Sequence, residues 1–405
     1  MRPILRSTPV RGSALELNES KVAVIGGGIV GLATLLELAR MGLQPVLFEA
    51  HGIASGVSGA SLAGITRHLA GEPDEVSFVM ESAARWKSLA FEFTTTLGLD
   101  IELDQHGHIA LVEATSDQEA QGAVSQRETA VREERARGLD VDMLDKKDVL
   151  RLLPAVNAAA FVAASWCPGD AKLNALVACR AMLAAAIRLG ATVHCEERVV
   201  GLESGWTVRT TKRSVHTDAI VLATGPWTSE LLQLTAVDLP SMRPKRAQCC
   251  VTEPLPNMIG PLVSSAHANL DTGYTQLHQT RHGEILFNTV IPTETRVAAD
   301  GEFVLSTDHQ FLVRSAARLL ELFPALEQAR VLRSWAGIEA WTSDRRFLIG
   351  EIPGRPGLFV AAGDSGLGFV RAPLIGVIVA ELVTRRPTRF DLTAYSPARA
   401  TLSAA

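Results

Sequence analysis

The spacing of hydrophobic residues changes twice within residues 21–50, "KVAVIGGGIVGLATLLELARMGLQPVLFEA". A β-branched apolar run leads into a glycine cluster, and apolar residues then recur at helical spacing, as at Ile29, Leu32 and Leu36. A second short apolar run, "PVLFEA", follows. The pattern predicts a strand, a turn, a helix and a second strand, which together make an α/β unit.

Two later segments repeat the change from an apolar run to glycine. Residues 217–227, "TDAIVLATGPW", are expected to form a buried strand that ends at Thr224, Gly225 and Pro226. Residues 357–382, "GLFVAAGDSGLGFVRAPLIGVIVAEL", show the same order before another helix. Three junctions between a strand and glycine, spread along the chain, suggest one extended ligand that all of them contact.

The segments between these junctions predict further elements. An alanine-rich helix is expected to stop at Gly190, and a strand follows from Ala191. Cys179 and Cys195 are therefore interpreted as small buried residues, the usual state of a free cysteine. Residues 117–137 are charged and favour a helix. The short alternating runs and the Pro, Thr and Val content of residues 239–323 are typical of an antiparallel sheet.

The first glycine cluster has the spacing of a dinucleotide-binding loop. Gly26, Gly28 and Gly31 fit G-x-G-x-x-G, which provides a tight turn, close approach of the backbone to a pyrophosphate and close helix packing. The helix N-terminus then faces the phosphates. Glu49 ends the second strand, where an acid accepts hydrogen bonds from ribose hydroxyls and repels a 2'-phosphate. The sequence therefore predicts a dinucleotide site.

The fingerprint does not separate FAD from NAD, because both cofactors present the same ADP half. The next segment, residues 51–68, "HGIASGVSGASLAGITRH", is too rich in Ser, Gly and Ala to build a core. Such residues suit close approach of backbone N–H groups to a ligand. A long ligand that runs past the first strand is implied.

The order of these motifs resembles that of the D-amino acid oxidase, sarcosine oxidase and glycine oxidase family of flavoproteins. The resemblance covers nearly the whole chain and rests on the G-x-G-x-x-G unit, the Ser/Gly loop 54–64, "ATGPW" at 223–227, "WAG" at 335–337 and "AAGDSGLGFVRAPLIG" at 361–376. "FDLTAYSPAR" is similar to the family's closing segment. "RPKRAQCCVTEPLP" and "LHQTRHGEIL" are most similar to the flavin subunits of opine oxidase, proline or hydroxyproline dehydrogenase and hydrogen cyanide synthase complexes.

The resemblance implies an α/β fold in which a Rossmann-like FAD-binding domain is interleaved with an α+β substrate domain built on an antiparallel sheet. It implies non-covalent FAD as well, since residues 251–405 lack the flavin-linking cysteine of sarcosine oxidases. The expected division is an N-terminal arm at 1–19, FAD-binding segments at 20–90, 150–230 and 333–390, substrate-domain segments at 91–149 and 231–332, and a C-terminal tail at 391–405.

The motifs and the resemblance together select the residues expected to contact FAD. They are Gly26, Gly28, Ile29, Val30, Gly31, Glu49, Ala50, Ser58, Ser61, Val199, Thr224, Gly225, Trp227, Gly337, Gly363, Gly366, Leu367 and Gly368.

The implied activity is oxidation of the C–N bond of an amino acid or secondary amine (an opine, a proline-like or an N-substituted amino acid) by hydride transfer to flavin N5. The imine that forms is then hydrolysed. Positioning does most of this work, so no dedicated catalytic base is required. The electron acceptor, which is oxygen, a quinone or another subunit, stays open.

The expected substrate anchor departs from the family pattern. Amino acid oxidases of this family hold the substrate carboxylate with arginine, whereas residues 338–340 here contain Glu339, and Gly366 stands where a second arginine is expected. Glu339 would repel a carboxylate and attract an ammonium, amidine or guanidinium group, as in opines built on arginine or ornithine. The alternative is a solvated glutamate paired with Arg345 or Arg346.

Other residues compete for roles at the substrate. Glu339, Trp341 and Arg246 form the predicted substrate-site set, and the tryptophans either wall a pocket or fill the core. The alternative carboxylate anchors are Arg243, Lys245, Arg246, Arg281 and Arg371, and the tryptophans in question are Trp227, Trp335 and Trp341.

Composition narrows the partners. The net charge is −5 and no Lys/Arg run exceeds two residues, so the basic stripe that nucleic acid requires is absent. Apolar stretches fall short of the roughly 20 residues that span a bilayer, so any membrane contact would be peripheral, at the inner face. Five cysteines without CxxC spacing favour a reducing cytoplasm. The partners expected are a small amine substrate and, by the resemblance, further protein subunits.

Two sequence features suggest metal or redox chemistry only weakly. "HGH" would put His106 and His108 on one face of a strand, but no third ligand lies nearby in the sequence, so no metal is predicted. Cys249 and Cys250 are adjacent in an expected strand and so face opposite ways, which favours packing of at least one of them.

Two other functions compete with the flavoenzyme. An NAD-dependent dehydrogenase explains the fingerprint but not the later glycine junctions. A flavin-containing subunit that relays electrons, without a substrate site of its own, explains the loss of the arginine anchors.

Overall fold

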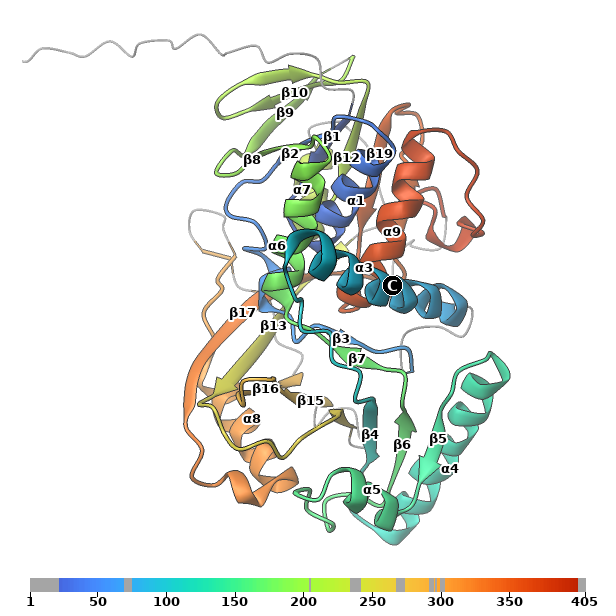
Figure 1. Ribbon diagram of the computed structural model, residues 1–405, viewed down its shortest axis with the longest axis vertical. Helices are drawn as coiled ribbons and strands as arrows, with labels where there is room; N and C mark the ends of the chain where they lie inside the picture. The colour runs from blue at the N-terminus through green and yellow to red at the C-terminus, as the bar shows by residue number, and fades with distance from the viewer. Residues whose placement is uncertain are drawn as a thin grey trace, which may run out of the picture.

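A computed structural model describes residues 22–68, 75–203, 205–233, 242–266, 274–290, 295, 297–298 and 303–399. The expected N-terminal arm and the last residues of the expected tail lie outside the described residues. Figure 1 shows two lobes, an upper one around β1, β2, β12 and β19 and a lower one around β4, β6, β15 and β16.

The upper lobe is built on a six-stranded sheet in the order β18-β19-β12-β1-β2-β8. Neighbours from β19 to β8 pair in parallel, and β18 is an antiparallel edge strand. The central strands are apolar throughout because both faces of the sheet are covered. The strands are β1 (Val22–Ile25), β2 (Val46–Phe48), β8 (Thr192–His194), β12 (Ala219–Leu222), β18 (Leu348–Glu351) and β19 (Leu358–Ala362).

Helices cover one face of this sheet and a small sheet covers the other. The helices contribute to one apolar core, and α1 and α9 approach so closely that a Cβ on Gly376 would meet the backbone carbonyl carbon of Ala33 at 2.6 Å. The helices are α1 (Ile29–Arg40), α3 (Val76–Leu97), α6 (Ala175–Arg188) and α9 (Gly368–Val383). The small antiparallel sheet contains β9 (Val199–Glu203), β10 (Thr207–Thr210) and β11 (Ser214–His216). These layers confirm the predicted Rossmann-like domain.

The lower lobe is built on an eight-stranded sheet in the order β17-β13-β16-β15-β14-β4-β6-β5. All neighbours are antiparallel except β14 and β4, which are parallel. The mainly antiparallel sheet of the expected substrate domain is confirmed. Its strands are β4 (His108–Val112), β5 (Asp142–Leu144), β6 (Ala163–Cys167), β13 (Met242–Thr252), β14 (Leu262–Ala266), β15 (Tyr274–Gln279), β16 (Ile285–Val290) and β17 (Val331–Thr342).

Helices flank this second sheet. One of them, α8, lies inside residues 239–323, where the sequence pattern indicated an antiparallel sheet. Asp308 caps its first turn through Phe311 N–H, and Phe311, Ser315, Leu319 and Leu322 form one buried face at helical spacing. The remaining helical elements are α4 (Asp117–Ala136), α5 (Lys146–Leu152), α7 (Thr228–Gln233), α8 (His309–Leu322), η2 (Gly225–Trp227), η4 (Pro324–Leu326) and η5 (Thr393–Tyr395).

The two lobes meet where short elements cross between them. Helix α2 (Val57–Ala60) lies on β17, and a Cβ on Gly337 would meet Val57 Cα at 2.7 Å, so only glycine permits this contact. Strands β3 (Gly64–Ile65) and β7 (Ala171–Lys172) pair between the lobes. Strands β6 and β17 both belong to the eight-stranded sheet. The expected division had put 163–167 and most of 331–342 in FAD-binding segments. A strand next to a domain crossing carries no sign in its sequence of which sheet it joins.

Candidate active site

The loop between β1 and α1 brings its backbone close to any ligand at the helix N-terminus. Gly26 has φ +109, and a Cβ on Gly31 would lie 2.0 Å from Gly26 O. Neither position accepts a side chain, because the helix packs directly on the turn. Ser58 Oγ, from the Ser/Gly segment, accepts a hydrogen bond from Ile29 N–H at 2.9 Å and ties that segment to the helix start.

Glu49 at the end of β2 is held beside this loop. Its Oε2 accepts from Gly27 N–H at 2.7 Å and its Oε1 accepts from His51 N–H at 2.8 Å. Each carboxylate oxygen keeps a further lone pair for a ligand hydroxyl. The geometry therefore matches the predicted role, a fixed acceptor for the ribose of an ADP group.

A cavity of about 340 Å³ starts at this loop and passes along the carboxyl ends of β1, β2, β12 and β19. Most of the predicted cofactor residues line it: Gly26, Gly28, Ile29, Val30, Glu49, Ala50, Ser58, Val199, Thr224, Gly225, Trp227, Gly363 and Gly368.

Five predicted contact residues do not line this cavity. Gly31 and Gly337 instead permit close packing, and Ser61 lines a second cavity of about 200 Å³ beside Trp335. Gly366 and Leu367 lie in the turn before α9.

The cavity also has lining residues that sequence reasoning missed. Asp364 follows the last residue of the "AAG" motif, and its place in that motif was the available signal. Arg198, Phe303 and Phe347 have no such signal, because they come from chain segments that only the folded lobes bring together.

The residues fit an FAD molecule. Glycine at 26 and 31 leaves the loop free of side chains, and the N-terminus of α1 faces the cavity. The long cavity continues past the dinucleotide loop to Gly363, which follows β19, and to Gly368, which begins α9. FAD would be held by these backbone groups together with Glu49 and Ser58.

Glu339 lies on β17 at the junction of the two lobes. Its Oε2 accepts a hydrogen bond from Trp341 Nε1 at 2.7 Å, and Lys245 is its direct cross-strand neighbour in the β13–β17 register. Residues opposite each other in an antiparallel pair share a face, as do residues two apart on one strand. Lys245 Nζ stacks 3.8 Å from the centre of the Trp341 ring. A carboxylate, an indole and an ammonium group thus form one surface.

The three side chains do not line the cavity, but they adjoin the turn whose ends, Gly363 and Gly368, do line it. A Cβ on Gly366 would lie 3.6 Å from both Glu339 carboxylate oxygens, and Asp364 Oδ1 accepts a hydrogen bond from Ala340 N–H at 3.2 Å. Burial, and next the neighbouring Asp364 carboxylate, raise the pKa of Glu339 to about 7. Burial likewise raises the pKa of Asp364. Two acids this close resist ionising together, so protonation of Glu339 changes near neutral pH.

The structure separates Arg246 from this surface. Its guanidinium is buried against α8, where it donates to Asp308 Oδ2 at 2.6 Å and to Ser306 O at 3.1 Å. It thus lies on the opposite face of β13 from Lys245, as strand alternation requires. Among the other alternative anchors, Arg281 pairs with Asp100 and Arg371 pairs with Glu75.

Several sequence interpretations of single residues can now be checked. Cys195 is exposed, not buried, because it follows β8, which is an edge strand of the six-stranded sheet. Cys249 and Cys250 are both buried and face opposite ways, Cys249 toward Ala60 O and Cys250 into the core of the lower lobe. Burial raises the pKa of the Cys250 thiol to about 12, which fits packing and not redox chemistry.

The interpretation of His106 and His108 as a pair on one strand face is wrong. Strand β4 begins at His108, and the preceding Gly107 has φ +76, which turns the chain. The His106 side chain is 67% exposed beside Asp104, whereas that of His108 is 1% exposed and contacts other buried polar groups.

The fold and site together define a class. A parallel sheet with a dinucleotide loop and a ribose-binding acid, joined to a large antiparallel sheet at one long cavity, is the architecture of a two-domain flavin-dependent oxidoreductase. The chain belongs to the DAO family of FAD dependent oxidoreductases, which it matches over residues 21–382.

Individual relatives agree with this assignment. Glycine oxidase of Geobacillus kaustophilus is 31% identical over 386 residues, which cover 93% of this chain and 96% of that protein. An opine oxidase subunit of Agrobacterium tumefaciens is 27% identical over 94% of this chain and 98% of that protein. The solved structure of L-proline dehydrogenase from P. horikoshii superposes with a TM-score of 0.83 at 28% identity, covering 94% of this chain and 97% of that chain.

The family resemblance drawn from the motifs is therefore confirmed, together with FAD as the cofactor and FAD-dependent oxidoreductase as the class of enzyme. An NAD-dependent dehydrogenase is not supported. In the described part of the chain, no helix combines the length and apolar character needed to cross a membrane.

Proposed function

We propose that this chain oxidises the C–N bond of an amino acid or secondary amine that carries a cationic group, with an arginine- or ornithine-derived opine as the type of substrate. The observation that carries the proposal is Glu339, a partly buried carboxylate whose oxygens would lie 3.6 Å from a Cβ on Gly366, in the turn between the cavity-lining residues Gly363 and Gly368. A carboxylate there attracts a cation and repels the carboxylate that an arginine would hold.

Three side chains would orient the substrate. Glu339 would accept hydrogen bonds from its cationic group, and Trp341 Nε1 holds the Glu339 carboxylate in place. Lys245 offers a positive charge on the same face, which suits the carboxylate of an amino acid. The surface is therefore complementary to a substrate with both charges.

Bound FAD supplies the acceptor for the hydride that leaves the substrate carbon. The protein supplies position: the substrate must be held with its C–H bond directed at the cofactor and its amine neutral. Glu339 can take up a proton near neutral pH because burial and Asp364 raise its pKa to about 7. The ionised form that attracts a cation is therefore the major form only above about pH 7.

Additional protein subunits form part of this proposal. Two relatives that match 94% of this chain are named as subunits of an opine oxidase, and such a name denotes one part of an assembly. The second candidate function, an electron-relay subunit without a substrate site, draws on the same relatives.

The test is anaerobic reduction of the FAD-loaded chain. Purified protein is mixed with neutral amino acids, N-methyl amino acids, prolines and arginine- or ornithine-derived opines, and loss of the oxidised flavin band near 450 nm is followed. Reduction by cationic secondary amines ahead of neutral ones is expected. Reduction by neutral substrates alone would overturn the role of Glu339, and no reduction by any amine would favour the electron-relay subunit.

A further inference from the structure

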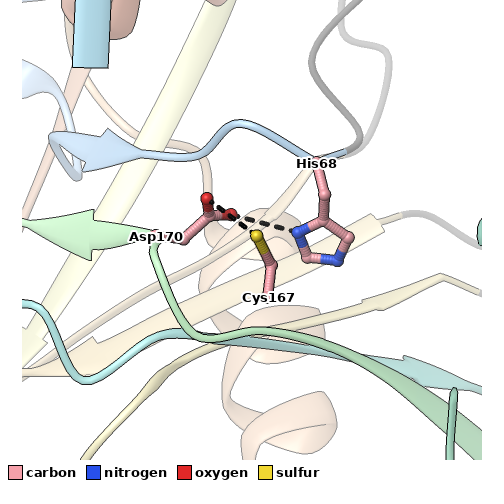
Figure 2. A group of neighbouring side chains, drawn as sticks. All are labelled: His68, Cys167 and Asp170. Atoms are coloured by element: carbon pink, nitrogen blue, oxygen red, sulfur yellow. Dashed lines mark hydrogen bonds and ion pairs between the residues drawn. The ribbon is translucent and has the colours of Figure 1, made fainter. Parts of the chain in front are cut away.

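Four polar side chains converge in the interior of the molecule, far from β17 in the sheet order. His68 follows β3, His108 begins β4, Cys167 ends β6, and Asp170 precedes β7. The side chains of His68, His108 and Asp170 are at most 1% exposed, and Cys167 is buried. Figure 2 shows three of them, with the His68 ring and the Cys167 sulfur directed at the Asp170 carboxylate.

The ligand atoms of His68, Cys167 and Asp170 all lie within 4.8 Å of one another, and His108 Nδ1 lies beside those of His68 and Asp170. Asp170 Oδ2 lies 3.0 Å from His68 Nδ1 and 3.5 Å from His108 Nδ1, and the two Nδ1 atoms are 3.1 Å apart. Metal–nitrogen and metal–oxygen bonds of about 2.0–2.1 Å in a tetrahedral zinc site place neighbouring ligand atoms about 3.3 Å apart. The fourth donor, Cys167 Sγ, lies 3.3 Å from Asp170 Oδ1 and within 4.8 Å of the His68 ligand atom.

The outer side of each imidazole has its own partner. His108 Nε2 lies 2.7 Å from Ser264 Oγ, and His68 Nε2 lies 3.4 Å from Ser165 Oγ. An imidazole whose outer nitrogen donates to an oxygen presents the lone pair of the inner nitrogen to a metal. Both inner nitrogens face Asp170, and at most one proton fits between two nitrogens 3.1 Å apart.

Arg67 is a charged neighbour of the cluster. Arg67 contacts the far side of the cluster, where Nε donates to Asp170 Oδ1 at 3.0 Å and Nη2 lies 3.4 Å from Cys167 Sγ. It leaves Asp170 Oδ2 to the histidines. A divalent ion with one carboxylate and one thiolate is neutral, and Arg67 then stabilises the two anionic ligands from outside the coordination shell.

We propose that His68, His108, Cys167 and Asp170 bind one structural divalent cation of the zinc class. The ligand set, two imidazoles, one thiol sulfur and one carboxylate, is of the kind zinc prefers, and four protein ligands with complete burial indicate a closed, structural site. The bound ion displaces the thiol proton of Cys167 to solvent. It joins the segment after β3 to the eight-stranded sheet and thereby fixes the junction between the lobes.

The sequence hid this site because its ligands are spread over about a hundred residues and share no short motif. The "HGH" segment suggested the wrong pair of histidines, because His106 is exposed and only His108 belongs to the cluster. The proposal does not depend on the substrate, and its test needs no activity.

The experiment is a metal analysis of the FAD-containing chain produced in zinc-supplemented medium and passed over a desalting column. About one zinc per chain is expected, because a buried site binds its metal as it folds. His108→Gln should lose the metal, while His106→Gln, which alters an exposed histidine two residues away, should retain it. Less than about a tenth of an equivalent in folded wild-type protein would overturn the proposal.

A second measurement keeps the test valid if His108→Gln fails to fold. Protein produced with cobalt should show visible ligand-field bands and a near-ultraviolet thiolate-to-cobalt band in the difference spectrum against metal-free protein. Cys167→Ser, which keeps a side chain of nearly the same shape, should lose the thiolate band. An unchanged thiolate band in Cys167→Ser would show that cobalt binds elsewhere and would refute the assignment.

Discussion

Replacement of Glu339 by glutamine tests the charge complementarity of the substrate surface. The amide keeps the shape of the side chain and its oxygen still accepts from Trp341 Nε1, which lies 2.7 Å from Glu339 Oε2. Only the negative charge is lost. The variant should therefore fold and bind FAD normally but discriminate less between cationic and neutral substrates.

The size of the effect follows from the kind of contact. A hydrogen bond to a charged partner contributes about 1.5–3 kcal/mol, a factor of about 10–150 in the dissociation constant. Lys245, on the same face, competes for Glu339 and favours the lower half of this range. Glu339→Gln should thus weaken the binding of a substrate with a guanidinium group by about tenfold. The binding of the matched substrate in which a neutral ureido group replaces the guanidinium should stay almost unchanged.

The pH dependence gives a second, independent sign. Glu339 with a pKa of about 7 is mostly protonated below that pH, so the preference for the guanidinium substrate should be weak in acid and rise as the pH passes through 7. Titration of the substrate amine is common to both isosteres and cancels in their ratio. The dissociation constants of the guanidinium substrate and of its ureido isostere are measured by stopped-flow flavin reduction. Their ratio should change with pH in the wild type and stay constant in the variant. An equal ratio in wild type and variant at every pH would refute the reasoning.

Three further substitutions test the cofactor site and the core. Gly31→Ala puts a methyl group 2.0 Å from Gly26 O and should cost about 1–3 kcal/mol of FAD binding, measured by flavin retention on dilution, whereas Gly52→Ala, which meets nothing within 4 Å, should not. Ser58→Ala removes the acceptor of Ile29 N–H and should lower the free energy of unfolding, measured in urea, by about 1 kcal/mol. The melting temperature and the FAD affinity should fall modestly as well. Glu75→Leu strands the fully buried Arg371 and should destabilise by about 3–5 kcal/mol in the same assay. Recovery is expected when Arg371→Met is added, and an additive loss would contradict it.

Local sequence patterns predicted the cofactor half of the molecule well, because its determinants are local. The glycine spacing, the helix after it and the acid at the end of β2 lie within thirty residues, and the structure brings them together as expected. The presence of one parallel and one antiparallel sheet could also be predicted, because buried parallel strands are apolar throughout whereas antiparallel strands alternate apolar and polar residues.

The parts that sequence reasoning missed depend on contacts between distant segments. Arg246 and Lys245 are adjacent in sequence, yet strand alternation and register send one to Asp308 and the other to the Glu339 surface. The cluster around Asp170 combines residues of the eight-stranded sheet with residues from the segments beside β3 and β7, between the lobes. Neither outcome follows from composition or motif spacing, because a one-residue change of register reverses which face a side chain occupies.

The backbone limits what can be concluded from Gly366. The missing arginine at this position and Glu339 both suggested a changed substrate anchor, but Gly366 has φ +86, a conformation that side chains rarely adopt. The turn before α9 therefore requires glycine for its own geometry, whatever the substrate. A Cβ at position 366 would contact the Glu339 carboxylate oxygens at 3.6 Å, but the glycine gives no independent support for a cationic substrate. The proposal rests on Glu339 alone, which is why its charge is the property to vary.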